Sequence, residues 1–182
     1  LPAEKLHFQP FHITLEDYEF EIRDDGYVFA GGNHGRDYRT VIEALAEVDY
    51  PVFIATQAPG IRELAKPYSH ITVKGVTPQE FRQAMAASTL VVEAHPADFF
   101  RTAGHKTFLN ALWMGKPFVM ADRKSARGYF EDGREWAVVE HGDVEGFRDR
   151  IRALLEDRES AAAMSRAAQG MARQPRFRTL NC

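Results

Sequence analysis

The sequence predicts an α/β fold with a parallel β-sheet covered by helices on both faces. Short apolar runs without period-two alternation recur along the chain, which is typical of strands that are buried on both sides. Stretches of helical period separate these runs, and the alternation of strand and helix predicts right-handed crossovers. We therefore expect a doubly wound, Rossmann-like sheet of about six strands.

Each unit of the expected sheet is a strand followed by a helix. The predicted strands are residues 27–30, 51–55, 71–73, 90–92, 118–121 and 136–139. The predicted helices are residues 36–48, 60–66, 77–87, 104–114, 142–155 and 158–172, with a short irregular helix near 126–130. The helix at Thr77 has three agreeing start signals, because Thr77 suits the cap, Pro78 suits the first position and Glu80 completes a capping box.

These units account for residues 27–172, which we expect to form one Rossmann-like domain. Residues 1–26 are expected to be a linker or edge segment. Within them, residues 13–22 alternate partly, which predicts an exposed edge strand or a short helix. Residues 173–182 are expected to form a basic, irregular tail.

Composition and charge exclude several functional classes. The net charge of −3 gives no basic excess for binding nucleic acid. No apolar run approaches the ~20 residues of a transmembrane segment, and the first residues lack the apolar core of a signal peptide. The single cysteine, Cys182, allows neither a disulfide nor a cysteine-based metal site within one chain. A reducing, cytoplasmic location fits these features.

The loops after the strands hold the candidate site, because ligands in such sheets lie beyond the carboxyl ends of the strands. After the first strand, Gly31 and Gly32 let a ligand approach the backbone closely. Asn33 follows, and Arg36 at the start of the helix is placed to meet a phosphate. The run is not G-x-G-x-x-G and no acidic ribose anchor follows it, which disfavours a conventional dinucleotide site. A plain glycine turn with a solvated arginine stays the alternative.

The loop after the third strand, Lys74-Gly75-Val76, offers backbone and apolar atoms on which a base can rest. A simple glycine turn before the capped helix explains it equally well. The chain has no Gly-x-Ser-x-Gly and no cysteine near a histidine, so the sequence shows no catalytic nucleophile of the hydrolase type.

Residues 101–121 form the most distinctive stretch, a small polar loop that leads into a helix and then a strand. Exposed backbone N–H groups at such a helix N-terminus, with nearby positive side chains, suit a diphosphate. A P-loop is rejected because the glycine and lysine spacing is wrong. The histidines show no metal-ligand spacing, and His95 and His105 are expected at the surface. The candidate diphosphate residues are Thr102, Ala103, Gly104, His105, Lys106 and Thr107.

The order of these motifs resembles the C-terminal, donor-binding domain of GT-B glycosyltransferases of the family-4, or group 1, kind. The resemblance covers residues 27–172 and is carried by the ordered set rather than by any single motif. The matching segments are 27–32, 36, 42–45, 52–55, 71–76, 80–88, 103–117, 132–133 and 142–143.

The resemblance implies a hexosyltransferase-type enzyme that transfers a sugar from a nucleoside-diphosphate sugar. Arg36, Gly31, Gly32 and the amides of residues 104–107 would hold the diphosphate, and Arg36 would stabilise it as the leaving group. The base would lie near residues 74–76, and the ribose at Asn110. No cofactor or metal ion is expected.

The resemblance also implies that the acceptor site lies on an N-terminal domain that this chain lacks. The chain would then be one lobe of a larger protein. In isolation it is expected to bind nucleotide weakly and turn over little. Any peripheral membrane contact would come through the parent protein.

Three positions depart from the family pattern. The ribose-binding glutamate is Asn110, the earlier paired glutamate has no counterpart near Arg101 and Thr102, and the arginine after the first strand is Gly31. Asn110 can hydrogen-bond a ribose hydroxyl, but a neutral amide holds it less firmly than a carboxylate. Two alternatives stay open. One is a non-catalytic GT-B-like module that binds a nucleotide or partner; the other is the lobe of a nucleotide-sugar 2-epimerase, which would need more acidic residues and a histidine in the cleft.

Overall fold

A computed structural model describes residues 2–5, 11, 13–15, 18, 20–98, 104–123, 126 and 129–177. Its sheet has six parallel strands in the order β3-β2-β1-β4-β5-β6. The strands are β1 (Val28–Gly31), β2 (Val52–Ala55), β3 (Ile71–Lys74), β4 (Leu90–Glu93), β5 (Phe118–Ala121) and β6 (Ala137–Val139). The order reverses between β1 and β4, which confirms the doubly wound, Rossmann-like fold and marks the switch point at which such sheets hold ligands.

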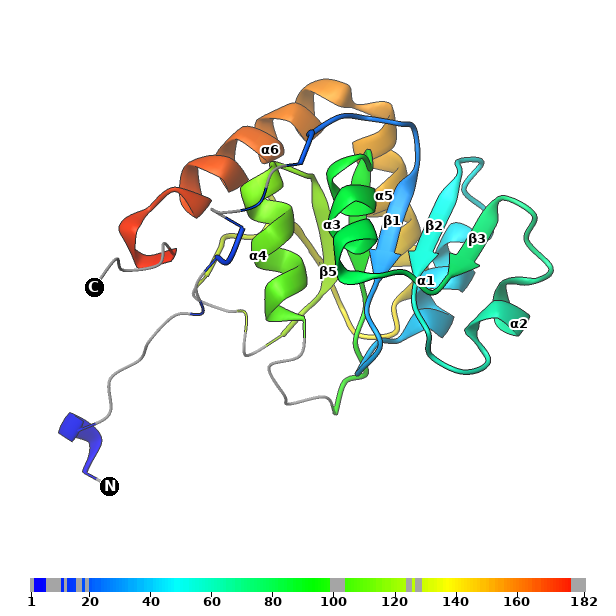
Figure 1. Cartoon of the computed structure of the whole chain (residues 1–182), viewed down its shortest axis with the longest axis horizontal. Coiled ribbons are helices and arrows are strands. Elements are labelled where there is room, and N and C mark those ends of the chain that lie inside the picture. The colour runs from blue at the N-terminus through cyan, green and yellow to red at the C-terminus, as the bar shows by residue number, and fades with distance from the viewer. Residues whose placement is uncertain are drawn as a thin grey trace.

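Helices cover both faces of this sheet, as Figure 1 shows. They are α1 (Tyr38–Leu45), α2 (Ile61–Ala65), α3 (Pro78–Ala86), α4 (His105–Met114), α5 (Val144–Glu156) and α6 (Arg158–Ala172), with 3-10 turns η1 (Ala3–Lys5) and η2 (Pro175–Phe177). Helices α1 and α5 pack on one face, and α3 and α4 pack on the other. None of the helices in the described part of the chain is long and apolar enough to cross a membrane.

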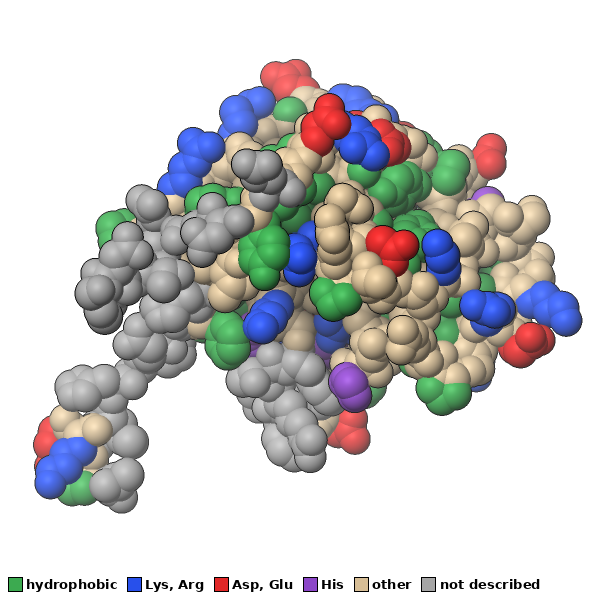
Figure 2. All heavy atoms as spheres, viewed as in Figure 1, with side chains coloured by type: hydrophobic (Ala, Val, Ile, Leu, Met, Phe, Trp, Pro, Cys, Tyr) green, Lys and Arg blue, Asp and Glu red, His purple; other side chains and the backbone are tan. Residues whose placement is uncertain are grey.

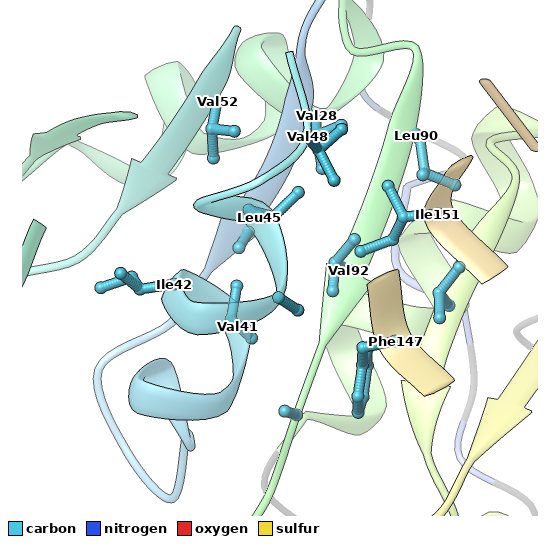
Figure 3. Packing of buried hydrophobic residues seen from close by; sticks show 14 of the residues in the cluster. Val28, Val41, Ile42, Leu45, Val48, Val52, Leu90, Val92, Phe147 and Ile151 are labelled. Atoms are coloured by element: carbon cyan, nitrogen blue, oxygen red, sulfur yellow. The ribbon is translucent and has the colours of Figure 1, made fainter. Parts of the chain in front are cut away.

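Side chains of the central strands alternate between two apolar clusters. Val28 and Val92 face α1 and α5, where they pack with Leu45 and Phe147 (Figure 3). Their neighbours in the strands face α3 and α4. Because successive side chains point to opposite faces, the last residue of β4, Glu93, lies on the α4 side of the sheet. This position puts a carboxylate beneath the beginning of α4.

The start of α3 has the capping box that the sequence predicts. Thr77 Oγ1 accepts a hydrogen bond from Glu80 N at 3.2 Å, and Glu80 Oε2 accepts one from Thr77 N at 2.8 Å. The start of α4 differs, because its cap residue Gly104 has a left-handed backbone (φ +97°) and no side chain to satisfy the first N–H groups. Helix α4 ends at Gly115, as predicted.

The flanking segments take part in the core on the α4 side. Ile13 and Leu15 are buried there, and Ile13 N donates a hydrogen bond to Phe177 O at 2.8 Å. The described residues of 13–22 form neither a strand nor a helix, so that prediction is wrong for them. Ala126 and Tyr129 lie in turns rather than in the predicted short helix, and residues 127 and 128 lie outside the described part.

Lys116, just before β5, fixes the approach to β1. Its side chain is buried, and Nζ donates hydrogen bonds to the carbonyl oxygens of Arg23 (2.6 Å) and Ser88 (2.7 Å). Burial lowers the pKa of Lys116 to about 8. The ammonium group therefore holds the segment before β1 against the turn before β4.

Candidate functional site

A pocket of about 420 Å³ lies between α3 and α4 at the carboxyl ends of the strands. The loops after β1, β2 and β3 contribute Asn33, Gln57 and Val76, and the remaining lining residues are Thr77, Pro78, Phe81, Arg82, Lys106, Thr107 and Asn110. Figure 2 shows Lys and Arg side chains over the groove between these two helices. The lining residues include Arg82 and Lys106 but no carboxylate, so the pocket favours an anionic ligand.

The structure brings together five of the residues predicted from the sequence, namely Asn33, Val76, Lys106, Thr107 and Asn110. Asn33 is fixed by its carboxamide, because Oδ1 accepts hydrogen bonds from Gln57 N (2.8 Å) and Thr56 Oγ1 (3.2 Å). The pocket therefore joins three loops that are far apart in the sequence.

The other predicted residues that the structure describes lie outside this lining. Lys74 is exposed at the end of β3, and Gly31, Gly32, Gly75 and Gly104 form the surrounding turns. The ring of His105 is buried, 4.9 Å from Phe108 and 5.7 Å from Tyr129, so it belongs to the aromatic core. Thr102 and Ala103 lie outside the described residues.

Arg36 is buried immediately behind the pocket, with only 7% of its side chain exposed. Its Nη2 donates a hydrogen bond to Thr107 Oγ1 at 3.0 Å, and its Nε donates one to Gly31 O at 3.0 Å. The same Nη2 lies 3.1 Å from Glu93 Oε2 in an ion pair. Arg36 is therefore not a solvated arginine, and it reaches the pocket wall through Thr107.

Glu93 is the centre of a buried charged cluster that joins the loops after β1, β4 and β5. Its Oε1 lies 2.5 Å from His95 Nε2 and 3.4 Å from Arg123 Nη1. His95 Nδ1 donates to the carbonyl oxygen of Gly35, and His95 Nε2 lies 3.1 Å from Arg123 Nη1. The cluster thus ties the switch point of the sheet together.

The cluster carries net positive charge. Burial opposes ionisation of Glu93, but Arg36, His95 and Arg123 outweigh it and lower the pKa of the Glu93 carboxyl. Burial lowers the pKa of His95, and the contact with Glu93 offsets part of that effect. Whether His95 is neutral or protonated, two guanidinium groups face one carboxylate. A positive field therefore lies behind Thr107.

Two glycines make room for side chains of this region rather than for a ligand. A Cβ on Gly104, whose φ is +97°, would collide with Glu93 Oε1 and lie 2.8 Å from Arg123 Nη1. A Cβ on Gly31 would lie 2.8 Å from Cζ of Phe81. The ring of Phe81 therefore occupies the space that a larger side chain at position 31 would fill.

Glu93, Arg123 and Arg82 are not among the residues predicted from the sequence. The predicted strand 90–92 ends one residue before β4 does, because a charged residue after an apolar run is usually solvated. Continuing the alternation of β4 by one residue would have placed Glu93 on the α4 face. The expectation of surface histidines is wrong, because His95 is 0% and His105 4% exposed. In the described part of the chain, no three His, Cys, Asp or Glu side chains are grouped to hold a metal ion.

The comparisons with solved structures show the same fold in several glycosyltransferases. HepE of Anabaena in complex with UDP-glucose aligns with a TM-score of 0.70 and 21% identity over 84% of this chain and 44% of that one. A glycosyltransferase of Rickettsia africae gives 0.67 and 16% over 80% and 42%. This chain therefore spans less than half the length of these two proteins.

A third structure is aligned over almost its whole length. The catalytic domain of cholesterol-α-glucosyltransferase from Helicobacter pylori gives a TM-score of 0.66 and 19% identity, over 80% of this chain and 96% of that one. No curated protein matches the sequence.

The sequence model of the family described as glycosyl transferase-like matches residues 36–178. This range begins at Arg36, includes every lining residue of the pocket except Asn33, and ends after Phe177. The chain is therefore a member of the glycosyl transferase-like family.

Proposed function

We propose that this chain is the donor-binding lobe of a glycosyltransferase that moves a sugar, of hexose type, from a nucleoside-diphosphate sugar to an acceptor. The observation that carries this proposal is the cationic pocket at the switch point, backed by the buried charges of Arg36 and Arg123. The UDP-glucose complex of HepE supports it, since that protein has the same fold. The acceptor site would lie on a second, N-terminal lobe.

The pocket has suitable groups for each part of the donor. The diphosphate would lie at the beginning of α4, against Lys106, Thr107 and the uncapped backbone N–H groups. Asn110, one turn further along α4, would hydrogen-bond the ribose. Val76 and Phe81 would contact the base.

Transfer breaks the bond between the anomeric carbon and the diphosphate, so negative charge grows on the leaving group. Arg36 is already positioned by Glu93, Thr107 and Gly31, and a fixed charge in a buried site needs no reorganisation during the reaction. We therefore assign Arg36 the stabilisation of the leaving diphosphate, with Arg123 adding to the field. This arrangement would require no metal ion.

The structure does not favour an epimerase lobe. Glu93 and His95 are the residue types that such a reaction would use, but they are 2% and 0% exposed. Both are enclosed by Arg36 and Arg123 and neither lines the pocket.

Calorimetric titration of the chain with UDP, GDP and ADP tests the donor site. We expect at least one of them to bind, weakly, and Lys106→Met to weaken that binding. Lys66→Met is the matched control, because Lys66 is exposed and pairs with Glu63 on α2. No heat of binding for any of the three at millimolar concentration would refute the proposal.

Activity requires both lobes, so the catalytic assignment is tested in a protein that contains them. Arg36→Lys retains the charge but loses the planar group that holds Thr107, Gly31 and Glu93 together. We expect kcat to fall more than the nucleotide affinity. An unchanged kcat would remove Arg36 from the mechanism.

A further inference from the structure

Arg82 is a half-buried cation that lines the pocket apart from the groups proposed to bind the diphosphate and the ribose. It lies on α3, one turn beyond Pro78, and lines the pocket beside Phe81. Within the described residues it has no ion-pair partner. An arginine that lines a pocket without a carboxylate beside it has its hydrogen-bond donors available for a ligand.

The guanidinium group of Arg82 is held by an aromatic ring. Its Cζ lies 4.0 Å from the centre of the Tyr18 ring. Tyr18 and Arg82 together line a neighbouring pocket of about 260 Å³, whereas Tyr18 does not line the candidate site. The ring therefore covers Arg82 from outside the candidate site. Stacking engages the face of a guanidinium and leaves its N–H groups free in the plane.

The surroundings of Arg82 suit a flat heterocycle. Phe81 is fixed edge-on against Phe29, with the ring centres 5.1 Å apart, and Val76 adds a further apolar contact. The carboxylate of Glu80 is engaged in the capping box, because its Oε2 accepts a hydrogen bond from Thr77 N at 2.8 Å. A base that rests on Phe81 and Val76 would meet Arg82 with its polar edge.

A guanidinium fork donates two parallel hydrogen bonds, so it selects a base edge with two adjacent acceptors. Guanine has such an edge in O6 and N7, whereas adenine places an amino donor beside N7. Uracil offers one carbonyl acceptor, O4, on the corresponding edge. We propose that Arg82 reads the nucleobase and that the pocket selects guanine, so that the donor is a GDP-sugar. This inference rests on the proposed donor site and assigns its substrate class.

Titration of the chain with GDP, ADP and UDP under identical conditions tests the selection. We expect GDP to bind about tenfold or more tightly than ADP, which is the size of discrimination that a bidentate arginine gives. Equal affinities for the three, or a preference for ADP or UDP, would overturn this inference and leave the donor site standing. Failure of all three to bind would instead refute the donor site itself.

Arg82→Gln sharpens the test, because a carboxamide pairs with N6 and N7 of adenine. We expect the ratio of GDP to ADP affinity to fall at least tenfold in this variant. Lys106→Gln is the matched control, since a lysine at the diphosphate should weaken GDP and ADP equally and leave their ratio unchanged. If Arg82→Gln weakens all nucleotides equally, Arg82 binds phosphate and the inference is wrong.

Tyr18→Leu provides a second variant that leaves Arg82 in place. Without the ring, the guanidinium group loses the face that orients it. We expect a smaller fall in the preference for GDP than in Arg82→Gln, with the affinity for UDP unchanged. A preference for GDP that Tyr18→Leu leaves intact would show that stacking does not prepare Arg82 for the base.

Discussion

Arg36 and Glu93 are 57 residues apart in the sequence, yet Nη2 of one lies 3.1 Å from Oε2 of the other at the switch point of the sheet. Both side chains are buried, with 7% and 1% exposed. This ion pair joins the loop after β1 to the end of β4 and places a guanidinium group against Thr107 in the pocket wall. It links the stability of the fold to the charge of the site.

Glu93→Gln is expected to destabilise the chain strongly. It would leave Arg36 and Arg123 buried without a counter-charge, and breaking a buried pair in this way costs about 3 to 5 kcal/mol. Urea unfolding followed by circular dichroism measures the loss. Glu43→Gln is the control, because Glu43 pairs with Arg39 at 3.6 Å on the exposed side of α1, where a pair contributes less than about 1 kcal/mol. Similar losses in both variants would contradict the assigned role of Glu93.

Gly104→Ala is expected to be more harmful than alanine at another glycine with positive φ. Gly104 (φ +97°) and Gly133 (φ +77°) both carry the backbone strain, but a Cβ at 133 meets no heavy atom within 4 Å. We expect Gly133→Ala to lose about 1 to 2 kcal/mol from strain alone, and Gly104→Ala to lose about 1 to 3 kcal/mol more from crowding against Glu93. Equal midpoints of unfolding would show that the loop yields to the extra carbon.

Because the pKa of Lys116 is lowered in the folded chain, we expect the stability of the chain to rise with pH above neutrality. Its pKa is about 8 in the folded chain and 10.5 when unfolded, so between these values the unfolded chain binds the extra proton and folding is favoured as pH rises. Below pH 8 both states are protonated and the group contributes no slope. Across this pH range the free energy of unfolding should rise by about 3 kcal/mol in total, at 1.36 kcal/mol per pKa unit. Unfolding in urea at pH 7 to 10 should show this rise relative to Lys116→Met, and parallel curves for the two proteins would contradict it.

Asn110→Glu is expected to tighten nucleotide binding, on the proposal that Asn110 faces the ribose. A carboxylate accepts hydrogen bonds from a ribose diol more strongly than a carboxamide does, so we expect the Kd to fall several-fold in calorimetry. Asn110→Asp separates reach from charge, since it adds the same charge on a shorter side chain. An unchanged or raised Kd in Asn110→Glu would show that Asn110 does not lie at the ribose.

The elements of this fold follow closely from local sequence, because their signals are local. Three residues, Thr77, Pro78 and Glu80, are enough to predict the start of α3, and Gly115 is enough to predict the end of α4. Segment 13–22 shows the limit of this approach. Ile13 and Leu15 alternate as in a strand, but they are buried in the core without forming one, because a ladder needs a partner strand that local sequence does not reveal.

The candidate site could be predicted only in part. The loops that follow parallel strands must meet, which predicts that Asn33 and Val76 lie near one another, and the resemblance to GT-B glycosyltransferases adds Asn110. One pocket contains all three. The pairing of Arg36 with Glu93 could not be predicted, because it depends on which strands become neighbours and on which face each side chain lies. For the same reason His95 and His105 were wrongly expected at the surface.

The two cations on either side of Thr107 differ in depth, since Lys106 is exposed whereas Arg36 is almost completely buried. Dissolved ions screen exposed charges over about 8 Å at physiological ionic strength but screen buried charges much less. Raising the concentration of potassium chloride should therefore remove the contribution of Lys106 to nucleotide affinity and leave that of Arg36. The affinity of the proposed site would then fall to a plateau rather than to zero, and that plateau would contain the buried charge together with the uncharged contacts to base and ribose.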